Sequence, residues 1–446
     1  MVASLLRNIN ELVWGVPLIL LLMGTSLYFS WKLKFLQVTH LGLAWKYLLR
    51  AQDNSASGDV SPFGSICTAL SATLGVGNII GVALAISMGG PGALFWMWVA
   101  TFFGMAVKYA EGVLSIRYRQ TGSDGKICGG PMYYIEFGLK SKWLARFFAF
   151  FGIGVALVGI GTWTQTNSIA VAMAKSFAIP ISATAAIAGC LVAIITIGGI
   201  RRIASVSEKV VPLMTIFYIG AAILVLIFKA PALPRAFASI FMGAFSPQAV
   251  LGGSTGVSVM AVMQRGISRG IFAHESGLGS AAIASAAART NSPSQQGLVA
   301  MVGAFLSIIV CTMTALVLLV TQRETGIFSR MMDETLLTSQ AFGIGLGVPA
   351  LGEYVVNLGI IFFAFTTVLG WNYYGEKCVQ YLFGTRAILA YKILFLFFVV
   401  IGPFWKLDLI FTVADIATGL MAIPNLIGLI GLRKVIFQET HLFQRG

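Results

Sequence analysis

Long apolar stretches separated by short polar ones dominate the hydrophobicity pattern of this chain. Leu12 to Trp31 is one such stretch, and Val60 to Val107 carries no charged side chain. Each membrane-crossing helix needs about 20 residues, so the second stretch can hold two of them. Residues 32–58 are polar enough to lie on the membrane surface. The pattern predicts an all-α polytopic membrane protein.

The apolar stretches predict eleven transmembrane helices, an extra N-terminal helix followed by ten core helices. The extra helix covers about residues 12–31 and has no convincing cleavage site, so we interpret it as a retained helix. The core helices, numbered 1 to 10 in this subsection, lie near 61–88, 91–116, 147–174, 181–200, 208–228, 255–290, 296–322, 351–380, 387–404 and 409–432.

Composition supports this class and excludes others. The chain is 57% hydrophobic and 10% charged, with a mean hydropathy of +0.87, whereas a soluble domain carries about 25% charged residues. The five cysteines show no Cys-x-x-Cys spacing, which argues against a disulfide framework or a zinc site. With three histidines in the chain, a multi-histidine metal site is excluded as well.

The basic residues orient the chain in the membrane. Of the 30 Lys and Arg residues, 20 fall in one set of loops and seven in the opposite set. Cytoplasmic loops carry the excess of Lys and Arg, so the N-terminus is expected outside and the C-terminus in the cytoplasm. The same loops explain the formal net charge of +14, and we expect no nucleic-acid partner.

Two core helices carry a helix-weakening motif in mid-span. Core helix 1 contains Gly75-Val76-Gly77-Asn78, and core helix 6 contains Gly277-Leu278-Gly279-Ser280. Glycine destabilises a helix interior by about 1 kcal/mol. Freed backbone groups in a membrane are tolerated where they line a cavity or meet a ligand. Close helix packing is the alternative explanation for each motif taken alone.

The spacing of the two motifs favours a transporter over simple packing. They lie five helices apart, so a five-helix unit repeated with inverted topology would bring both to one site at the membrane midplane. Half-helix N-termini expose N–H groups to a carboxylate, and half-helix C-termini expose carbonyls to a cation. Such a site suits a zwitterion that travels with Na⁺.

Several strings in the chain are similar to a known transporter family. They are Gly75-Val76-Gly77-Asn78-Ile79, Lys108-Tyr109-Ala110-Glu111, Gly129-Gly130-Pro131-Met132-Tyr133-Tyr134, Gln165-Thr166-Asn167-Ser168 and Arg269-Gly270-Ile271-Phe272-Ala273-His274-Glu275-Ser276-Gly277-Leu278-Gly279-Ser280. The chain resembles the alanine/glycine:cation symporter family over nearly its whole length. The family commonly reads Phe-Ser-Asn-Glu-Ala-Gly in core helix 6, where this chain has Ala273, His274 and Ser276.

The resemblance implies a LeuT-like fold of two inverted five-helix repeats. The expected divisions are 1–58 for the extra helix and surface segment, 59–230 and 231–435 for the two repeats, and 436–446 for a cytoplasmic tail. It also implies sodium-driven import of alanine or glycine through a bacterial inner membrane. No cofactor is expected, and Na⁺ is the coupling ion.

The resemblance assigns a sodium site to core helices 1 and 8. Thr366 and Thr367 are adjacent hydroxyls in an apolar run, and hydroxyls back-bonded to their own helix are the alternative. The fold places such hydroxyls opposite the carbonyls of Ser71 and Leu74, and Phe363 adds a third carbonyl. Asn78 is a candidate ligand for a second Na⁺.

The expected substrate site surrounds the break in core helix 1. Gly75, Val76 and Gly77 are expected to hold the carboxylate, and carbonyls around Phe272, with Gln165 nearby, the amino group. Phe272 and Trp371 are expected to cap a small side-chain pocket. Further candidate substrate contacts are Thr73 and Asn372. Each aromatic can equally be plain core.

The remaining polar residues of the spans are expected to be structural or gating. Because an unpaired carboxylate in a membrane is unfavourable, Glu275 is expected to pair with Arg265 or Arg269. Lys108 and Glu111 lie three apart on one helix face and most simply pair with each other. His274 is expected to pack or hydrogen-bond beside the break, with proton transfer as the alternative.

Other functions stay open at this point. Within the transporter class the alternative is a proton-coupled or glutamine-type carrier. Outside it, a passive channel and a membrane-embedded hydrolase are possible. The motif Gly-x-Ser-x-Gly occurs at 252–256 and 266–270, yet a nucleophile elbow needs a strand–turn–helix context that the pattern does not show. We therefore do not expect an enzyme.

Overall fold

The computed structural model describes residues 2–49, 56–246, 258–326, 334–405 and 407–445. The α-helices are α1 Val2–Val13, α2 Val16–Lys32, α3 Leu36–Thr39, α4 Leu41–Leu49, α5 Pro62–Thr73, α6 Ile80–Gly89, α7 Gly92–Arg117, α8 Pro131–Tyr133, α9 Lys142–Val158, α10 Trp163–Phe177, α11 Ile181–Ile197, α12 Gly199–Phe228, α13 Leu233–Phe245, α15 Val259–His274, α16 Ser280–Ala286, α17 Pro293–Val320, α18 Gln322–Thr325, α19 Glu334–Leu346, α20 Pro349–Phe383, α21 Ile388–Ile401, α22 Leu407–Gly431 and α23 Arg433–Arg445.

Short elements join these helices. The 3-10 turns are η1 Val76–Asn78, η3 Ala230–Ala232, η4 Thr385–Ala387 and η5 Gly402–Phe404, and η2 Tyr134–Gly138 is a π-helical turn. Strands β1 Gln120–Thr121 and β2 Ile127–Cys128 form an antiparallel hairpin in which Gln120 pairs with Cys128.

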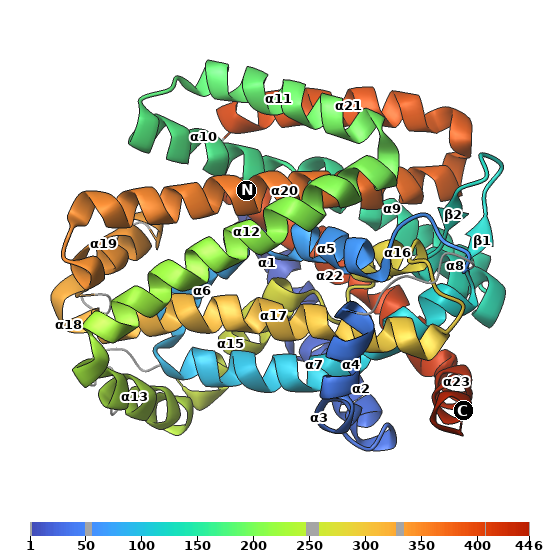
Figure 1. Ribbon diagram of the computed structural model, residues 1–446, viewed down its shortest axis with the longest axis horizontal. Coiled ribbons are helices and arrows are strands. Elements are labelled where there is room, and N and C mark those ends of the chain that lie inside the picture. Colours follow the sequence, from blue (N-terminus) through green and yellow to red (C-terminus); the bar gives the residue numbers. More distant parts are fainter. Residues whose placement is uncertain (1, 50–55, 247–257, 327–333, 406, 446) are drawn as a thin grey trace.

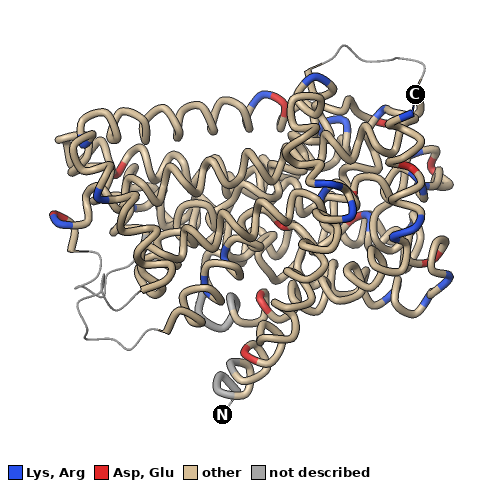
Figure 2. Tube along the Cα trace, turned by 90° about the horizontal axis from the view of Figure 1, so that it is seen from below, with Lys and Arg blue, Asp and Glu red and all other residues tan. Residues whose placement is uncertain are grey.

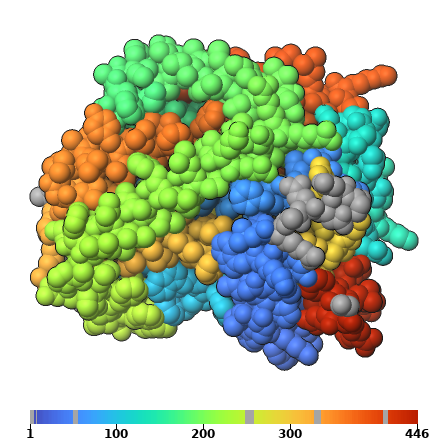
Figure 3. All heavy atoms as spheres, viewed as in Figure 1, coloured from blue at the N-terminus to red at the C-terminus, as the bar shows by residue number. Residues whose placement is uncertain are grey.

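The long helices lie side by side along the longest axis of the molecule (Figure 1). α7 packs against α17 and α15, and α20 packs against α10, α9 and α12. In Figure 3, α12 crosses the visible face diagonally, with α4 beside it and α23 at the lower edge. The broken pairs α5–α6 and α15–α16 lie among these long helices, which therefore bury them.

Eight segments of the described chain are long and apolar enough to cross a membrane. They are Asn8–Lys32, Gly92–Arg117, Lys142–Phe177, Gly199–Phe228, Pro293–Val320, Pro349–Phe383, Thr385–Phe404 and Thr412–Gly431. Ile80–Gly89 and Ile181–Ile197 are shorter apolar helices. The prediction of an all-α chain with many membrane spans is confirmed, while the count of eleven stays a prediction.

The predicted extra helix is bent. α1 and α2 meet at Trp14 and Gly15, and Gly15 is extended, with φ −68° and ψ −179°. Pro17 follows in the first turn of α2, where its missing N–H leaves no hydrogen bond unmade. α1 packs against α22, and Figure 2 shows the N-terminal end of the chain standing out from the body.

The third core helix, expected to run unbroken near 147–174, is two helices. α9 ends at Val158 and α10 begins at Trp163. A Cβ on Gly161 would lie 2.6 Å from Cβ of Trp371, so only a glycine fits against the Trp371 side chain at this position. The break also brings Ile160 and Gln165 to the cavity described below.

The described parts of the polar segment and of the predicted tail pack against the helical bundle. Within the described part of 32–58, α4 packs against α17. The tail expected at 436–446 belongs to α23, in which Ile436 and Thr440 are buried. The Thr440 hydroxyl lies 2.8 Å from the Tyr109 hydroxyl. The C-terminal helix is therefore part of the folded bundle.

Candidate functional site

The break between α5 and α6 exposes backbone groups inside the bundle. α5 ends at Thr73, and Gly75 is extended, with φ −120° and ψ −163°. A Cβ on Gly75 would lie 2.8 Å from Thr367 Oγ1, whereas a Cβ on Gly77 would have no neighbour within 4 Å. Gly75 is thus required for a close approach, and Gly77 faces open space.

Two side chains hold the freed N–H groups of this break. The Gly75 N–H donates to Asn78 Oδ1 at 3.1 Å, and the Val76 N–H donates to Gln165 Oε1 at 3.3 Å. Gln165 in turn donates from Nε2 to the carbonyl of Ile160 at 2.9 Å. The break in α9–α10 and the break in α5–α6 therefore meet through one glutamine.

The predicted sodium ligands converge on the Thr367 hydroxyl. Thr367 Oγ1 lies 3.0 Å from the Ser71 carbonyl, 3.3 Å from the Leu74 carbonyl and 2.9 Å from the Phe363 carbonyl. Two of these four oxygens belong to α20 and two to the end of α5. Thr367 is 296 positions from Ser71 and 293 from Leu74 in the sequence. Oxygens are the ligands that hard cations prefer.

Thr366 contributes differently from its neighbour. Its hydroxyl lies 3.1 Å from the Phe362 carbonyl and 3.0 Å from the Phe363 carbonyl, and 3.7 Å from Met214 Sδ. The Phe363 carbonyl is shared by both threonines. Thr366 therefore borders the oxygen cluster, and its other contacts are to its own helix and to a thioether.

A cavity of about 430 Å³ opens beside this oxygen cluster. Its lining includes the predicted residues Thr73, Gly75, Val76, Gly77, Gln165, Arg269, Phe272, Glu275, Thr367 and Trp371. Leu84, Thr164 and Asp415 line it as well. The structure thus brings most predicted substrate-site residues together, in a space larger than the small closed pocket that we expected for a methyl side chain.

The break between α15 and α16 is a buried turn with left-handed residues. Glu275, Gly277 and Gly279 have φ of 54°, 87° and 78°. Glu111 Oε1 accepts from the Gly277 and Gly279 N–H groups at 3.0 and 3.1 Å. Asn425 donates from Nδ2 to the same oxygen at 2.8 Å and to the Gly277 carbonyl at 2.9 Å. One carboxylate oxygen therefore holds this turn closed.

This geometry corrects the predicted Lys108–Glu111 pair. In the described structure the Lys108 ammonium forms no hydrogen bond and no close ion pair. It lies within electrostatic reach of both Glu111 and Glu275. The Glu111 side chain extends from α7 to the α15–α16 turn, where it accepts hydrogen bonds from the backbone.

The predicted ion pair of Glu275 with an arginine is also wrong. Glu275 Oε2 accepts from the Ser280 hydroxyl at 2.6 Å. Arg265 Nη1 donates to the Met88 carbonyl, and the Arg269 guanidinium lies 5.5 Å from the centre of the Phe272 ring. The backbone at Glu275 is left-handed, and its carboxylate bonds within its own turn, although Glu275 and Arg269 line the same cavity.

His274 is a structural residue of the same turn. Its Nδ1 accepts from the Ser276 N–H at 3.1 Å, and its side chain is 1% exposed. It does not belong to the cavity lining. The geometry agrees with the expected packing role beside the break.

Three further predicted residues lie outside the cavity lining. Asn78 uses its amide within the protein, accepting from the Gly75 N–H and donating to Ser307 Oγ at 2.9 Å. Asn372 is 1% exposed, and its carbonyl accepts from the Tyr391 hydroxyl at 3.2 Å. Thr366 was described above. A substrate contact by Asn372 and a sodium contact by Asn78 stay predictions.

Asp415 is a charged lining residue that the sequence analysis did not predict. It lies on α22, and Arg269 is close enough for the two charges to interact. A carboxylate inside an otherwise apolar span is itself a signal of function, which could have identified it. Asp415 and Arg269 place opposite charges at one end of the cavity.

Polar contacts close the opposite end of the broken helices. Val60, before α5, pairs with Ala288, after α16, and the Arg119 guanidinium donates to the carbonyls of Ala286, Ala288 and Thr290. Asp59 accepts from the Ile127 N–H at 2.9 Å. The half-helices that leave the cavity on this side are therefore tied to each other.

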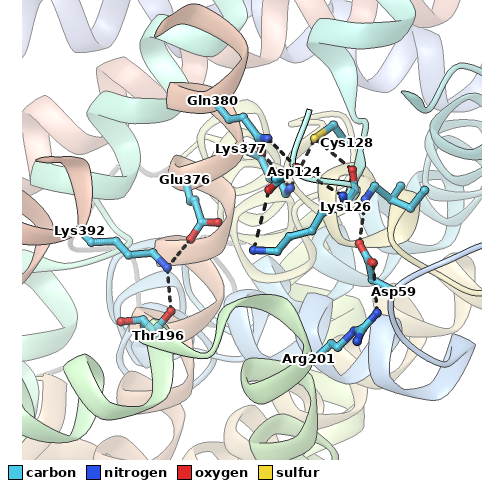
Figure 4. A network of polar contacts seen from close by, with 11 residues as sticks. Asp59, Asp124, Lys126, Cys128, Thr196, Arg201, Glu376, Lys377, Gln380 and Lys392 are labelled. Carbon is cyan, nitrogen blue, oxygen red and sulfur yellow. Dashed lines mark hydrogen bonds and ion pairs between the residues drawn. The ribbon is translucent and has the colours of Figure 1, made fainter. Parts of the chain in front are cut away.

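Figure 4 shows how this closure extends to the outer helices. Arg201 of α12 lies 3.9 Å from Asp59, and Lys392 of α21 lies 3.1 Å from Glu376 of α20. Lys377 donates to Gln380 Oε1 at 2.9 Å. Basic residues gather at the same end of the molecule, at the right of Figure 2. These contacts join the segments before α5 and after α16 to the outer helices, and none of these contact residues belongs to the cavity lining.

The enzyme-like motif in the described part of the chain does not form a nucleophile elbow. Residues 266–270 lie within α15, so Ser268 has no strand–turn–helix context. The motif at 252–256 lies outside the described residues.

Comparison with known proteins decides the family. The family model described as the Sodium:alanine symporter family matches residues 1–446. The chain belongs to this family. As a member of the sodium:alanine symporter family it is a multi-pass membrane transporter and not an enzyme.

Two curated relatives cover this family member almost from end to end. An uncharacterized transporter of Haemophilus influenzae is 49% identical over 447 residues, covering 100% of this chain and 97% of that protein. The sodium/alanine symporter AgcS of Methanococcus maripaludis is 43% identical over 446 residues, covering 99% and 97%.

A solved structure supports the fold of the family member. The crystal structure of MhsT in complex with L-phenylalanine matches with a TM-score of 0.56 at 12% identity, covering 86% of this chain and 99% of that one. The predicted LeuT-like fold is confirmed at this level.

Proposed function

We propose that this protein is a sodium-coupled symporter that imports small neutral amino acids, alanine and glycine first. The observation that carries the proposal is the cluster of Thr367 Oγ1 with the carbonyls of Ser71, Leu74 and Phe363, next to a cavity lined by the same helix break. An ion held there would draw α5 and α20 together. The relative from Methanococcus maripaludis is named a sodium/alanine symporter, which supports sodium as the coupling ion and alanine as a substrate.

The hydrogen bond between Val76 and Gln165 suggests how a zwitterion binds. The substrate carboxylate takes over the Val76 N–H, beside the open space at Gly77. Gln165 Oε1, released from that N–H, accepts from the substrate ammonium. One internal hydrogen bond is thus exchanged for two bonds to ionised groups, which are roughly twice as strong as neutral ones.

Coupling follows from the shared backbone of the two sites. Ser71 and Leu74 supply carbonyls on one side of the break, and Gly75 and Val76 face the cavity on the other. Na⁺ at the carbonyls therefore fixes the same residues that bind the substrate. Each solute then raises the affinity for the other by the same factor, as linkage requires.

Transport requires the cavity to open on either side of the membrane in turn. We assign residues 59–230 and 231–435 to two inverted repeats that rock around the cavity, in a bacterial inner membrane with the N-terminus outside. The closed basic end, held by Asp59–Arg201 and Arg119–Ala288, is then the cytoplasmic end. The cavity mouth near Leu84 and Asp415 faces outward.

The cavity volume of about 430 Å³ exceeds the needs of alanine. Selection against leucine therefore depends on closure of Phe272 and Trp371 over the substrate, since a clash rejects an isobutyl group only in the closed state. Without such a clash, an apolar pocket discriminates between two substrates by only about 1–3 kcal/mol for each methylene by which they differ.

Uptake by proteoliposomes tests the proposal. We expect labelled alanine to accumulate under an inward Na⁺ gradient, with glycine competing and leucine not competing. Accumulation driven by a proton gradient at equal Na⁺ would indicate a proton-coupled carrier, and competition by glutamine a glutamine-type carrier. Equilibration without accumulation would indicate a channel, and release of product from an ester a hydrolase.

A further inference from the structure

The extra N-terminal helix contributes a side chain to the wall behind the cavity. Trp14 lies at the bend between α1 and α2 and is 7% exposed. Its ring centre lies 4.6 Å from that of Phe272, with an interplanar angle of 33°. Phe272 lines the cavity, and Trp14 does not. Trp14 therefore reaches the cavity through Phe272.

Trp14 is fixed on its other side by α22. Its Nε1–H donates to the Asp415 carbonyl at 2.8 Å. A Cβ on Gly419 would lie 3.1 Å from Trp14 Nε1, so the glycine permits this close approach. The bend of the extra helix is thus anchored to a second lining residue of the cavity.

A second cavity of about 290 Å³ lies behind the same wall. Trp14 lines this second cavity together with Leu84 and Arg269. Leu84 and Arg269 also line the substrate cavity, so the two spaces share a boundary. The Trp14 ring and the Phe272 ring lie at that boundary in contact with each other.

We propose that Trp14 is a positioning residue that sets the size selectivity of the substrate cavity. The indole holds Phe272 in place and keeps the rear cavity separate from the substrate cavity. Without the indole, Phe272 gains rotational freedom, and the substrate cavity extends into the space behind it. This inference rests on the proposed function for its substrate and assigns a role to the helix that precedes the core.

Replacement of Trp14 tests the proposal by substrate selectivity. In proteoliposomes, Trp14→Ala should raise the KM for alanine roughly 3- to 10-fold, the equivalent of one lost aromatic contact, with Vmax little changed. Leucine should become a competitor. Trp14→Phe should restore the KM and the exclusion of leucine, because a ring can still stack on Phe272.

Two controls separate this role from a general structural one. Trp31→Ala removes a tryptophan of α2 that is 69% exposed and should behave as wild type. The half-saturating Na⁺ concentration, measured by Na⁺ binding without alanine, should stay unchanged in Trp14→Ala, because Trp14 makes no contact with the Thr367 cluster. A fall in Vmax with KM and selectivity unchanged would overturn the proposal and leave Trp14 a folding residue.

A transport-independent measurement keeps the two proposals distinguishable. The lining residue Ile80 is replaced in an Ile80→Cys variant that also carries Cys190→Ser, which removes the exposed native thiol. A membrane-impermeant thiol reagent should label the introduced thiol several-fold faster when Trp14→Ala is added. Equal labelling rates would overturn the role of Trp14. Absence of sodium-driven alanine uptake by the wild type would overturn the proposed function while leaving this labelling test intact.

Discussion

The two broken helices share a Gly-x-Gly motif followed by a small polar residue, yet they use it in opposite ways. At Gly75–Gly77 the backbone has negative φ, lines a cavity and leaves open space beside Gly77. At Gly277–Gly279 both glycines have positive φ, and a buried carboxylate takes their N–H groups. The first break borders a cavity, where we propose that a ligand binds, and the second has its N–H groups bound by a buried carboxylate.

The difference lies in which groups supply the hydrogen-bond partners. The turn between α15 and α16 obtains them from Glu111, Asn425 and His274, which are fixed parts of the bundle. The break between α5 and α6 obtains one from Gln165, a side chain in the cavity wall. A Gly-x-Gly motif in a membrane helix is therefore not by itself evidence of a binding site.

The largest effect is expected from Glu111→Ala. The change leaves the N–H groups of Gly277 and Gly279 and one N–H of the Asn425 amide without their acceptor, at about 1–3 kcal/mol for each unpaired group. The melting temperature in detergent should fall steeply, or the protein should fail to fold. Glu111→Gln keeps an acceptor oxygen and should recover much of the stability. Equal stability of the alanine variant and the wild type would contradict the internal role of this carboxylate.

The second-largest effect is expected from Gly279→Ala. At φ +78° a Cβ is strained by about 1–2 kcal/mol, and it would lie 2.5 Å from Pro131 Cγ. We expect a lower melting temperature and reduced amounts in the membrane. Gly77→Ala is the matched change in the other break and should melt like the wild type, since it meets no neighbour and no strain. Similar melting temperatures for both variants would remove the distinction between the breaks.

Gly77→Ala should nevertheless lose transport. Its methyl occupies the space through which the carboxylate approaches the Val76 N–H, so alanine uptake should fall by about tenfold or more, equivalent to 1.4 kcal/mol. Gly75→Ala should instead disturb Na⁺ dependence, because its Cβ would lie 2.8 Å from Thr367 Oγ1. Normal alanine uptake by Gly77→Ala, measured in proteoliposomes, would mean that the substrate binds elsewhere.

The smallest effect is expected from His274→Asn. Asparagine can offer Oδ1 to the Ser276 N–H in place of the imidazole nitrogen, and the resembling family commonly has asparagine here. Alanine uptake should stay within about twofold of wild type, with no change near pH 6.5, where an unperturbed histidine titrates. A pH profile that flattens in this variant would identify His274 as a proton carrier.

The sequence predicts the cavity better than the supports around it. Gly75 and Thr367 stand out because polar or flexible residues in apolar spans are unfavourable without a function. The partnership of Glu111 with Asn425 joins residues 314 positions apart and carries no local signal. Local spacing favours Lys108 as the partner of Glu111, and tertiary packing overrides it.

The hydrophobicity pattern also does not predict where helices end or bend. The apolar run through Gly159–Thr162 predicts one span, and in the structure it is broken where Gly161 lies against Trp371 on a distant helix. Asp415 is the contrary case, since its charge in an apolar run was visible and went unused. Hydrophobicity thus predicts which segments cross the membrane, while contacts between distant helices decide where those segments break.

We propose that Na⁺ and the amino acid meet at the break between α5 and α6. Sodium titration of alanine binding tests this proposal most directly. Thr367→Val removes an oxygen from the cluster and should raise the half-saturating Na⁺ concentration about 5- to 150-fold, equivalent to about 1–3 kcal/mol. Thr366→Val, the adjacent control, should shift it less, because Thr366 Oγ1 contacts its own helix and Met214. An unchanged titration in Thr367→Val would contradict the account.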